Sequence, residues 1–124
     1  MYPLRILIIE SDPVRKILMR QTFQDDFITF HKSIDLILNL DLNLFDLIVL
    51  NNEVEGIECL KWIIAVHQLH YKHLPLIFVS KDELKCNLTS NFINVFSCKH
   101  DEALYFELFN LYRLIFSTKV ELNA

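Results

Sequence analysis

Short apolar runs recur along this 124-residue chain, and segments with helical spacing separate them. Each run contains several β-branched residues and is bounded by polar ones, a pattern typical of strands buried on both faces of a sheet. We expect five such strands, at residues 4–9, 27–30, 47–50, 76–79 and 93–96.

Apolar residues spaced three and four apart predict the helices between these strands. The first stripe is Val14, Ile17, Leu18 and Gln21, the second Ile34, Ile37 and Leu38, the third Ile57, Leu60, Ile64 and His67, and the last Leu104, Leu108, Leu111 and Ile115. Ser11 or Asp12 before Pro13 marks the start of the first helix, Ser33 that of the second and Asp101 that of the last. Residues 81–91 are polar and without a clear stripe, so the fourth helix is the least distinct.

A strand–helix unit repeated five times predicts an α/β fold of class (βα)5, a doubly wound five-stranded parallel sheet. The chain is 52% hydrophobic and 23% charged and has no linker or repeat, so we expect one domain over residues 1–124. In such sheets the chemistry lies at the carboxyl ends of the strands. The groups to consider there are 10–12, 51–53, 80–81 and 98–99.

Charge and composition exclude several classes of function. The net charge of −4 argues against a general nucleic-acid binder. No apolar run reaches the roughly 18 residues of a membrane span, and no secretory signal precedes the first strand. The only glycine is Gly56, which excludes glycine-rich nucleotide-binding loops. Three cysteines without a C-x-x-C pair indicate reduced thiols, and we expect a cytoplasmic protein with no membrane partner.

Four motifs at the strand ends together resemble one known family. They are residues 6–13 (ILIIESDP), 45–51 (FDLIVLN), 74–80 (LPLIFVS) and 96–99 (FSCK). Their order and spacing are similar to those of the receiver (CheY-like) domain of two-component response regulators, which has a flavodoxin-like fold. In that family an acid pair binds Mg²⁺, an Asp accepts a phosphoryl group, and a Ser or Thr and a Lys contact that group. The resemblance covers the whole chain.

This chain departs from the family where the chemistry occurs. Asn51 stands at the position of the phosphoacceptor Asp, and a neutral carboxamide is not a usable nucleophile toward phosphorus. Ser11 replaces the second acid, which leaves Glu10, with Asp12 nearby, as a weak Mg²⁺ site at best. We therefore expect a pseudo-receiver with no catalytic residue, no cofactor and no resident metal. Asn51 would hold one state through hydrogen bonds that a carboxylate cannot donate.

Ser80 and Lys99 keep the residue types of the family, and Phe96 matches its switch aromatic. With no phosphoryl group to contact, we expect Ser80 to form local hydrogen bonds. For the same reason we expect Lys99 to pair with Glu10 or Asp12.

A second stripe on the last helix consists of Tyr105, Phe109, Tyr112 and Phe116. It lies about 100° around the helix from the first stripe, so one sheet contact cannot cover both. The rings either pack on a neighbouring helix or form a protein-binding surface, and we favour the surface. The resemblance implies a partner or a second copy at the face of the fourth helix, fifth strand and fifth helix. Trp62, Val66 and Leu69 extend the third helix's apolar surface in the same undecided way.

Two other constellations are poor sites. His67, His70 and His73 lie three apart, but no acid or Cys is in register to complete a metal site. Cys98 precedes Lys99, yet it alternates with Phe96 and is expected to face the core. The sequence therefore predicts a stand-alone, phosphorylation-independent signalling module of a two-component pathway, not an enzyme. The alternatives are phosphorylation of Asp12 or Ser11, or a small-ligand sensor using the same cleft.

Overall fold

The computed structural model describes residues 3–53 and 58–123, with the side chains of the last helix described as far as Phe116. Within these residues five strands form one parallel sheet in the order β2-β1-β3-β4-β5. The strands are β1 (Arg5–Ile9), β2 (Phe27–His31), β3 (Leu47–Asn51), β4 (Leu76–Ser80) and β5 (Val95–Lys99). The α helices are α1 (Pro13–Thr22), α2 (Cys59–Trp62), α3 (Gln68–His70), α4 (Glu83–Thr89) and α5 (Leu104–Asn123). The predicted fold class is confirmed.

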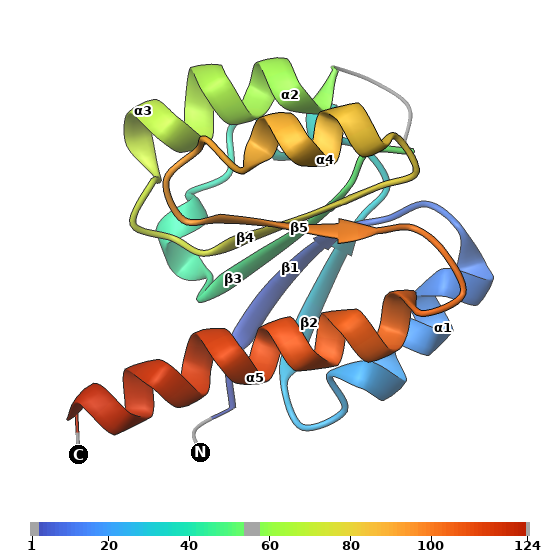
Figure 1. Ribbon diagram of the computed structural model, residues 1–124, viewed down its shortest axis with the longest axis vertical. Coiled ribbons are helices and arrows are strands. Elements are labelled where there is room, and N and C mark those ends of the chain that lie inside the picture. Colours follow the sequence, from blue (N-terminus) through green and yellow to red (C-terminus); the bar gives the residue numbers. More distant parts are fainter. Residues whose placement is uncertain (1–2, 54–57, 124) are drawn as a thin grey trace.

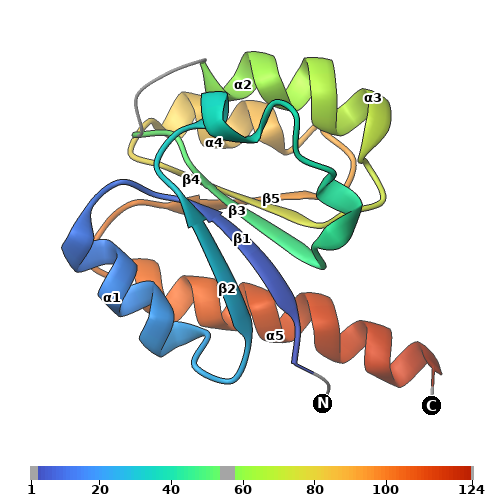
Figure 2. The same ribbon diagram turned by 180° about the vertical axis from the view of Figure 1, so that it is seen from behind.

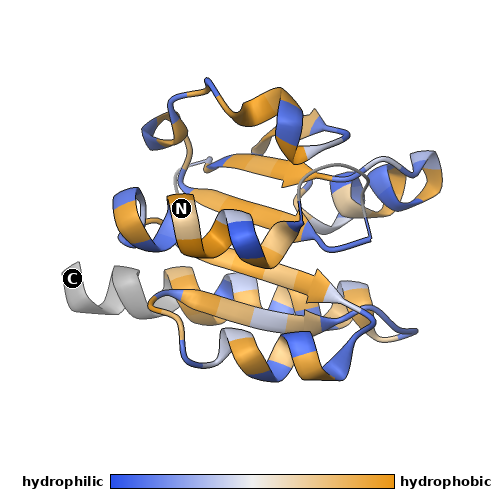
Figure 3. Cartoon of the chain, turned by 90° about the horizontal axis from the view of Figure 1, so that it is seen from above, coloured by the Kyte–Doolittle hydropathy of each residue, from blue (hydrophilic) through white to orange (hydrophobic). Residues whose placement is uncertain are grey.

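Helices cover both faces of this sheet. Helices α1 and α5 lie side by side on one face, and α2, α3 and α4 lie on the other, with the same layers visible from behind (Figures 1 and 2). Such a three-layer arrangement follows from right-handed crossovers between parallel strands. The hydropathy colouring shows apolar strands between helices that mix apolar and polar positions (Figure 3).

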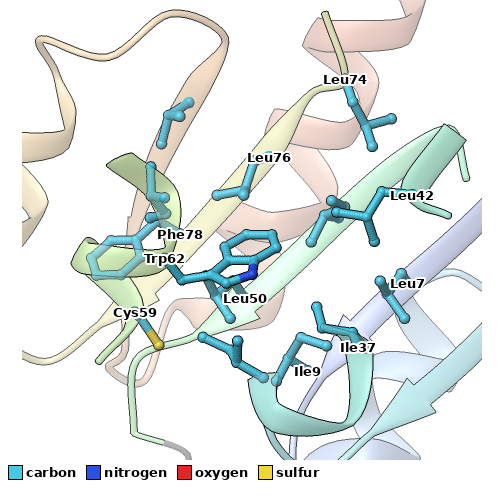
Figure 4. Packing of buried hydrophobic residues seen from close by; sticks show 14 residues of the cluster. Leu7, Ile9, Ile37, Leu42, Leu50, Cys59, Trp62, Leu74, Leu76 and Phe78 are labelled. Atoms are coloured by element: carbon cyan, nitrogen blue, oxygen red, sulfur yellow. The ribbon is translucent and has the colours of Figure 1, made fainter. Parts of the chain in front are cut away.

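The central strands are enclosed by the two helical layers. Every residue of β3 and β4 is buried, as are the last four residues of β1, whereas the edge strands β2 and β5 are only partly covered. On the face of α2, Trp62 and Cys59 pack over Leu50 and Phe78 (Figure 4). On the other face Met19 and Phe23 pack with residues of α5.

Two elements differ in extent or type from the sequence prediction. The second helix is replaced by two 3-10 turns, η1 (Ile34–Ile37) and η2 (Leu42–Leu44). Ser33 makes no capping hydrogen bond, whereas the Asp41 side chain accepts one from the Asn43 N–H and starts the second turn. Strand β5 begins two residues later than predicted. Asn94, at a φ of 60°, makes the turn before it, and Ile93 is held outside the sheet by the Gln68 side chain.

The buried faces of α1 and of the α2–α3 segment differ from those that the sequence predicts. In α1, Val14 and Ile17 are 64% and 57% exposed, and the core residue is Met19. Helix α2 continues through a π-helical stretch, η3 (Ile63–His67), into α3. The buried residues there are Cys59, Trp62, Ile63 and His67; Ile64 and Leu69 are exposed, Leu60 and Val66 are half-buried, and Ile57 lies outside the described residues. The buried face of this segment is therefore the one that contains the large indole of Trp62.

Helix α5 also buries a different face from the one predicted. Leu104 and Leu108 contact the core as expected, but Tyr112 and Phe116 complete the buried stripe, while Leu111 and Ile115 are only half-buried. The Tyr112 ring lies 5.4 Å from that of Phe23 at the end of α1 and 5.5 Å from that of Phe116.

The prediction of a four-ring binding surface is therefore wrong for Tyr112 and Phe116, which pack inside the chain. Tyr105 is half-buried on the same side of the helix, next to α1, and Phe109 is 42% exposed with the Arg113 guanidinium over its ring. The rings follow the α1 side of α5 rather than the side that faces β5.

Candidate functional site

The residues singled out at the strand ends lie together at the carboxyl edge of the sheet. Glu10 follows β1, and Asn51, Ser80 and Lys99 are the last residues of β3, β4 and β5. The strand register aligns Asn51 with Val79 and Ser80 with Lys99. Glu10, Asn51 and Ser80 are completely buried, while Lys99 is exposed.

The Glu10 carboxylate is the centre of this edge. Its Oε1 accepts a hydrogen bond from Asn51 Nδ2 at 2.7 Å and another from Arg15 Nε at 2.7 Å. Its Oε2 accepts from Arg15 Nη2 at 3.1 Å and from the backbone N–H groups of Ser11 and Asp12 at 2.8 and 3.1 Å. A buried carboxylate needs such donors, because an unpaired buried charge is costly.

Arg15, which the sequence prediction does not include, binds Glu10 in a bidentate manner from the first turn of α1. Asp12 caps this helix by accepting a hydrogen bond from the Arg15 N–H at 2.9 Å, which fixes the backbone that carries the guanidinium. A signal was present in the sequence. A cation in the first turn of a helix opposes the macrodipole, and apart from the capping Asp12 the start of α1 has no acid to offset it. Such a residue needs a partner elsewhere.

The pKa of Glu10 reflects this environment. Burial alone would raise the pKa of the carboxyl, but the hydrogen bonds from Arg15, Asn51 and the Asp12 backbone outweigh burial and hold the pKa below its usual value. The hydrogen bond to Glu10 raises the pKa of Arg15. Glu10 is therefore a charged, internally neutralised carboxylate at pH 7.

Asn51 uses both ends of its amide. While Nδ2 donates to Glu10, Oδ1 accepts from the Glu53 N–H at 3.0 Å. The opposite amide orientation would place two acceptors against each other at Glu10 and two donors at Glu53, so the network itself fixes the assignment. The expected hydrogen bond from the amide, which a carboxylate could not donate, is present.

The residues that the sequence offers to Mg²⁺ do not fit that ion. Both oxygens of Glu10 are occupied by donors, and Asn51 presents an N–H₂ group to them. Asp12 is engaged as the cap of α1, and Ser11 is exposed with its N–H on Glu10. A hard cation needs free oxygen ligands, and the Glu10 carboxylate with the Asn51 amide group that faces it offers none.

Ser80 and Lys99 point to different partners. Ser80 Oγ accepts from the Asp82 N–H at 3.0 Å and from Asn52 Nδ2 at 3.3 Å, as the local interpretation predicts. The prediction that Lys99 pairs with Glu10 or Asp12 is wrong: its Nζ lies 3.6 Å from Glu83 Oε1, and both side chains are largely exposed. Arg15 already neutralises Glu10, so Lys99 pairs with the carboxylate beside its own strand.

Phe96 and Cys98 are two residues apart and lie on the same side of β5, which faces the core cluster of α1 and α5. Phe96 is half-buried against the α1–α5 face of the core, and the buried Cys98 thiol lies 3.4 Å from Glu107 Oε2. Burial raises the pKa of Cys98, and the carboxylate of Glu107 adds to the effect. Burial likewise raises the pKa of Cys59 to about 12. These thiols lack the thiolate character of a nucleophile.

The three spaced histidines are separated by the fold. His67 is buried, with Nε2 2.7 Å from the Leu74 carbonyl oxygen and Nδ1 2.8 Å from Gln68 Nε2. His73 lies on the surface beside Asn43, and His70 is exposed. Among the described residues, no three His, Cys, Asp or Glu side chains form a group that could hold a metal ion.

Comparison with known proteins places the fold. No family model and no curated protein sequence matches the chain. Solved structures do. A protein assigned as a response regulator from Chloroflexus aurantiacus J-10-fl aligns with a TM-score of 0.74 at 16% identity, over 94% of this chain and 99% of the other. The signal receiver domain of an HD domain-containing protein from Pseudomonas fluorescens Pf-5 aligns with a TM-score of 0.74 at 17% identity, over 99% and 93%.

A third match is an adenylate cyclase structure from Rhodopirellula baltica, with a TM-score of 0.65 at 18% identity and 98% coverage of both chains. At 16–18% identity, the likeness to these solved structures establishes the fold alone. The parallel sheet in the order β2-β1-β3-β4-β5, with helices on both faces, is the flavodoxin-like fold of response-regulator receiver domains.

Within the described part of the chain, no helix is long and apolar enough to cross a bilayer.

Proposed function

We propose that this chain is a signalling module of the two-component receiver type that acts through protein–protein contacts without accepting a phosphoryl group. The observation that carries the proposal is the hydrogen bond from the Asn51 amide to Glu10, within a carboxylate site that the chain saturates with its own donors. The receiver fold of the structural neighbours supports the signalling role.

The chemistry of the strand edge is consistent with this proposal. Phosphoryl transfer to a receiver-like edge would need a carboxylate nucleophile and a cation to offset charge on the phosphoryl oxygens. Asn51 supplies no nucleophile, and Lys99 is turned toward Glu83. What remains is an internally neutralised edge in which Glu10 joins β1 to α1 and β3.

The alternative acceptors are less well placed. The Asp12 carboxylate is held by the Arg15 N–H at the start of α1, and phosphorylation there would cost the helix its cap, about 1 kcal/mol. Ser11 is exposed, and within the described residues its hydrogen bond to a side chain is made by its backbone N–H to Glu10, not by its hydroxyl. A pocket between β5 and α5, lined by Ser97, Glu107, Asn110 and Leu111, includes no strand-end residue of this site, so it does not support a small-ligand sensor there.

Treatment with a phosphodonor tests the proposal directly. Incubation of the wild-type protein with acetyl phosphate, or with beryllofluoride, in 10-fold excess Mg²⁺ should leave the intact mass and the amide NMR spectrum unchanged. The matched control is the same treatment of an active receiver domain. A stoichiometric mass increase of about 80 Da, the mass of one phosphoryl group, mapping to this edge would refute phosphorylation independence.

The partner surface is a second element of the proposal, and we assign it to a second copy of the chain at the face of α4, β5 and α5. On α4, Leu84 and Leu88 lie one turn apart and are 67% and 46% exposed. The exposed Glu83–Lys99 pair beside them presents both signs of charge, which a twofold interface can match reciprocally. The aromatic stripe of α5 is not part of this surface.

Substitution of these leucines should weaken self-association. Sedimentation velocity of the wild type should show a sedimentation coefficient that rises with concentration, and Leu84→Glu/Leu88→Glu should sediment as a monomer throughout. The control is Leu69→Glu on α3, where the side chain is 70% exposed but lies outside this face. A wild type that stays monomeric at all concentrations, or a control that loses association equally, contradicts the assignment.

A further inference from the structure

We infer that the Arg15 guanidinium is a built-in substitute for a divalent cation at the carboxyl edge of the sheet, so that Asn51 is only one of two independent blocks to metal binding. This inference rests on the proposed function, because it concerns the same edge. It adds a second residue, Arg15, to the reason why the edge is inert.

The geometry of the carboxylate carries the first step. A carboxylate offers about four lone-pair positions. Glu10 receives five hydrogen bonds, two of them from the guanidinium fork of Arg15 at 2.7 and 3.1 Å. An entering cation would have to displace Arg15 from Glu10 and would be repelled by the positive charge of the guanidinium. The bidentate pair therefore competes with metal for the same oxygens.

The anchoring of Arg15 carries the second step. Its backbone is held by the Asp12 cap, and the ion-pair side chains of Arg15 and Glu10 are 26% and 0% exposed. The neighbouring Lys16 does not share this role, because its ammonium lies over the Phe30 ring at 6.0 Å. The competition with metal therefore depends on the guanidinium at position 15 and not on positive charge anywhere in the first turn, and Lys16 provides a matched control.

A consequence follows for the reverse substitution. Changing Asn51 to Asp restores a second carboxylate 41 positions from Glu10 in sequence but adjacent to it in space. Because Arg15 Nε and Asn51 Nδ2 donate to the same oxygen, Glu10 Oε1, the guanidinium would lie beside the new carboxylate and would offset the charge of both acids. A single Asn51→Asp variant should remain a poor metal binder, and only removal of the guanidinium as well should create an oxygen-rich site.

The experiment compares three variants: Asn51→Asp, Asn51→Asp/Arg15→Met and Asn51→Asp/Lys16→Met. Mn²⁺ and Mg²⁺ are titrated at pH 7, with Mn²⁺ followed by electron paramagnetic resonance of the free ion and both metals by thermal denaturation. We expect Asn51→Asp/Arg15→Met to bind Mn²⁺ at least about 10-fold more tightly than the other two, a change of about 1.4 kcal/mol. Its melting temperature should rise with metal, whereas the Lys16 control should behave like Asn51→Asp.

The test remains decisive even if the Asn51→Asp/Arg15→Met variant does not fold without metal. If the double variant is unfolded without metal, added Mn²⁺ or Mg²⁺ should restore the helical circular dichroism signal, because binding is then coupled to folding. Equal affinities in Asn51→Asp and Asn51→Asp/Arg15→Met, or no response to metal in folded or unfolded double variant, overturn the inference. Neither result bears on phosphodonor treatment of the wild type, so the two proposals can fail separately.

Discussion

Replacement of Arg15 with Met should lower the free energy of unfolding by about 3–5 kcal/mol at pH 7, the typical cost of breaking a buried ion pair from one side. Glu10 is completely buried and would keep its charge without its bidentate partner. The hydrogen bonds from Asn51 and two backbone N–H groups would remain, but they supply no positive charge. Urea denaturation measures the change.

Two further variants isolate the charge. Glu10→Gln/Arg15→Met removes both members of the pair and should recover most of the lost stability, since no unpaired charge is then buried. Lys16→Met removes a cation at the next position and should cost less than about 1 kcal/mol, the range of an exposed cation–π contact. A loss in the double variant as large as in Arg15→Met would mean that the packing of the Arg15 stem, rather than its charge, stabilises the fold.

The same pair predicts a dependence on pH. The pKa of Glu10 in the folded wild type lies below its usual value of about 4.3, so its stabilising contribution is present above that value and is lost as the pH falls through the folded pKa. In Arg15→Met, burial without the guanidinium raises the pKa of the carboxyl. Glu10 then becomes neutral on acidification, and the gap in stability between variant and wild type should narrow from pH 7 toward pH 4.

The sequence is sufficient to predict the sheet because its strands are short apolar runs with clear polar ends. Once the strands are parallel, their carboxyl ends must meet, which is why the sequence alone predicts that Glu10, Asn51 and Ser80 lie at the same edge. Hydrophobic pattern and topology therefore determine which positions share the edge.

The partners at that edge depend on side-chain rotamers, which periodicity does not encode. Lys99 was expected to neutralise Glu10, but Arg15 reaches Glu10 from the start of α1 and leaves Lys99 to Glu83. Lys99 is the last residue of β5 and Arg15 lies in the first turn of α1, so both cations start near the carboxyl edge of the sheet. The bidentate geometry of the guanidinium, which an ammonium cannot reproduce, decides between them.

The prediction of the buried helix faces is wrong for a related reason. In α5, two apolar stripes lie next to each other, and the one that contains Tyr112 and Phe116 fits against Phe23 of α1. The Tyr112 hydroxyl is also hydrogen-bonded to Asp26, which together with burial raises its pKa. The spacing of apolar residues in one helix does not show which other element they pack against. The pattern of α5 alone therefore favours a binding surface where the structure has an intramolecular aromatic cluster of Phe23, Tyr112 and Phe116.

His67 links the helix and strand layers at the opposite edge of the sheet, and His67→Ala should lower the free energy of unfolding by about 2–4 kcal/mol. In the neutral ring, Nε2–H donates to the Leu74 carbonyl and Nδ1 accepts from Gln68, whose side chain also binds the backbone of Ile93. Truncation leaves a cavity and an unsatisfied carbonyl, whereas the same change at the exposed His70 should cost less than about 0.5 kcal/mol.

Acid should act on the same residue. Burial lowers the pKa of His67 in the folded state, against the hydrogen bond to Leu74, which raises it. The unfolded chain therefore takes up its proton first, so the contribution of His67 to stability is complete above pH of about 6.5 and declines below it. Wild-type stability should fall more steeply between pH 7 and 5 than that of His67→Ala. Equal slopes in urea titrations would contradict this prediction, because they would show that folding does not change the pKa of His67.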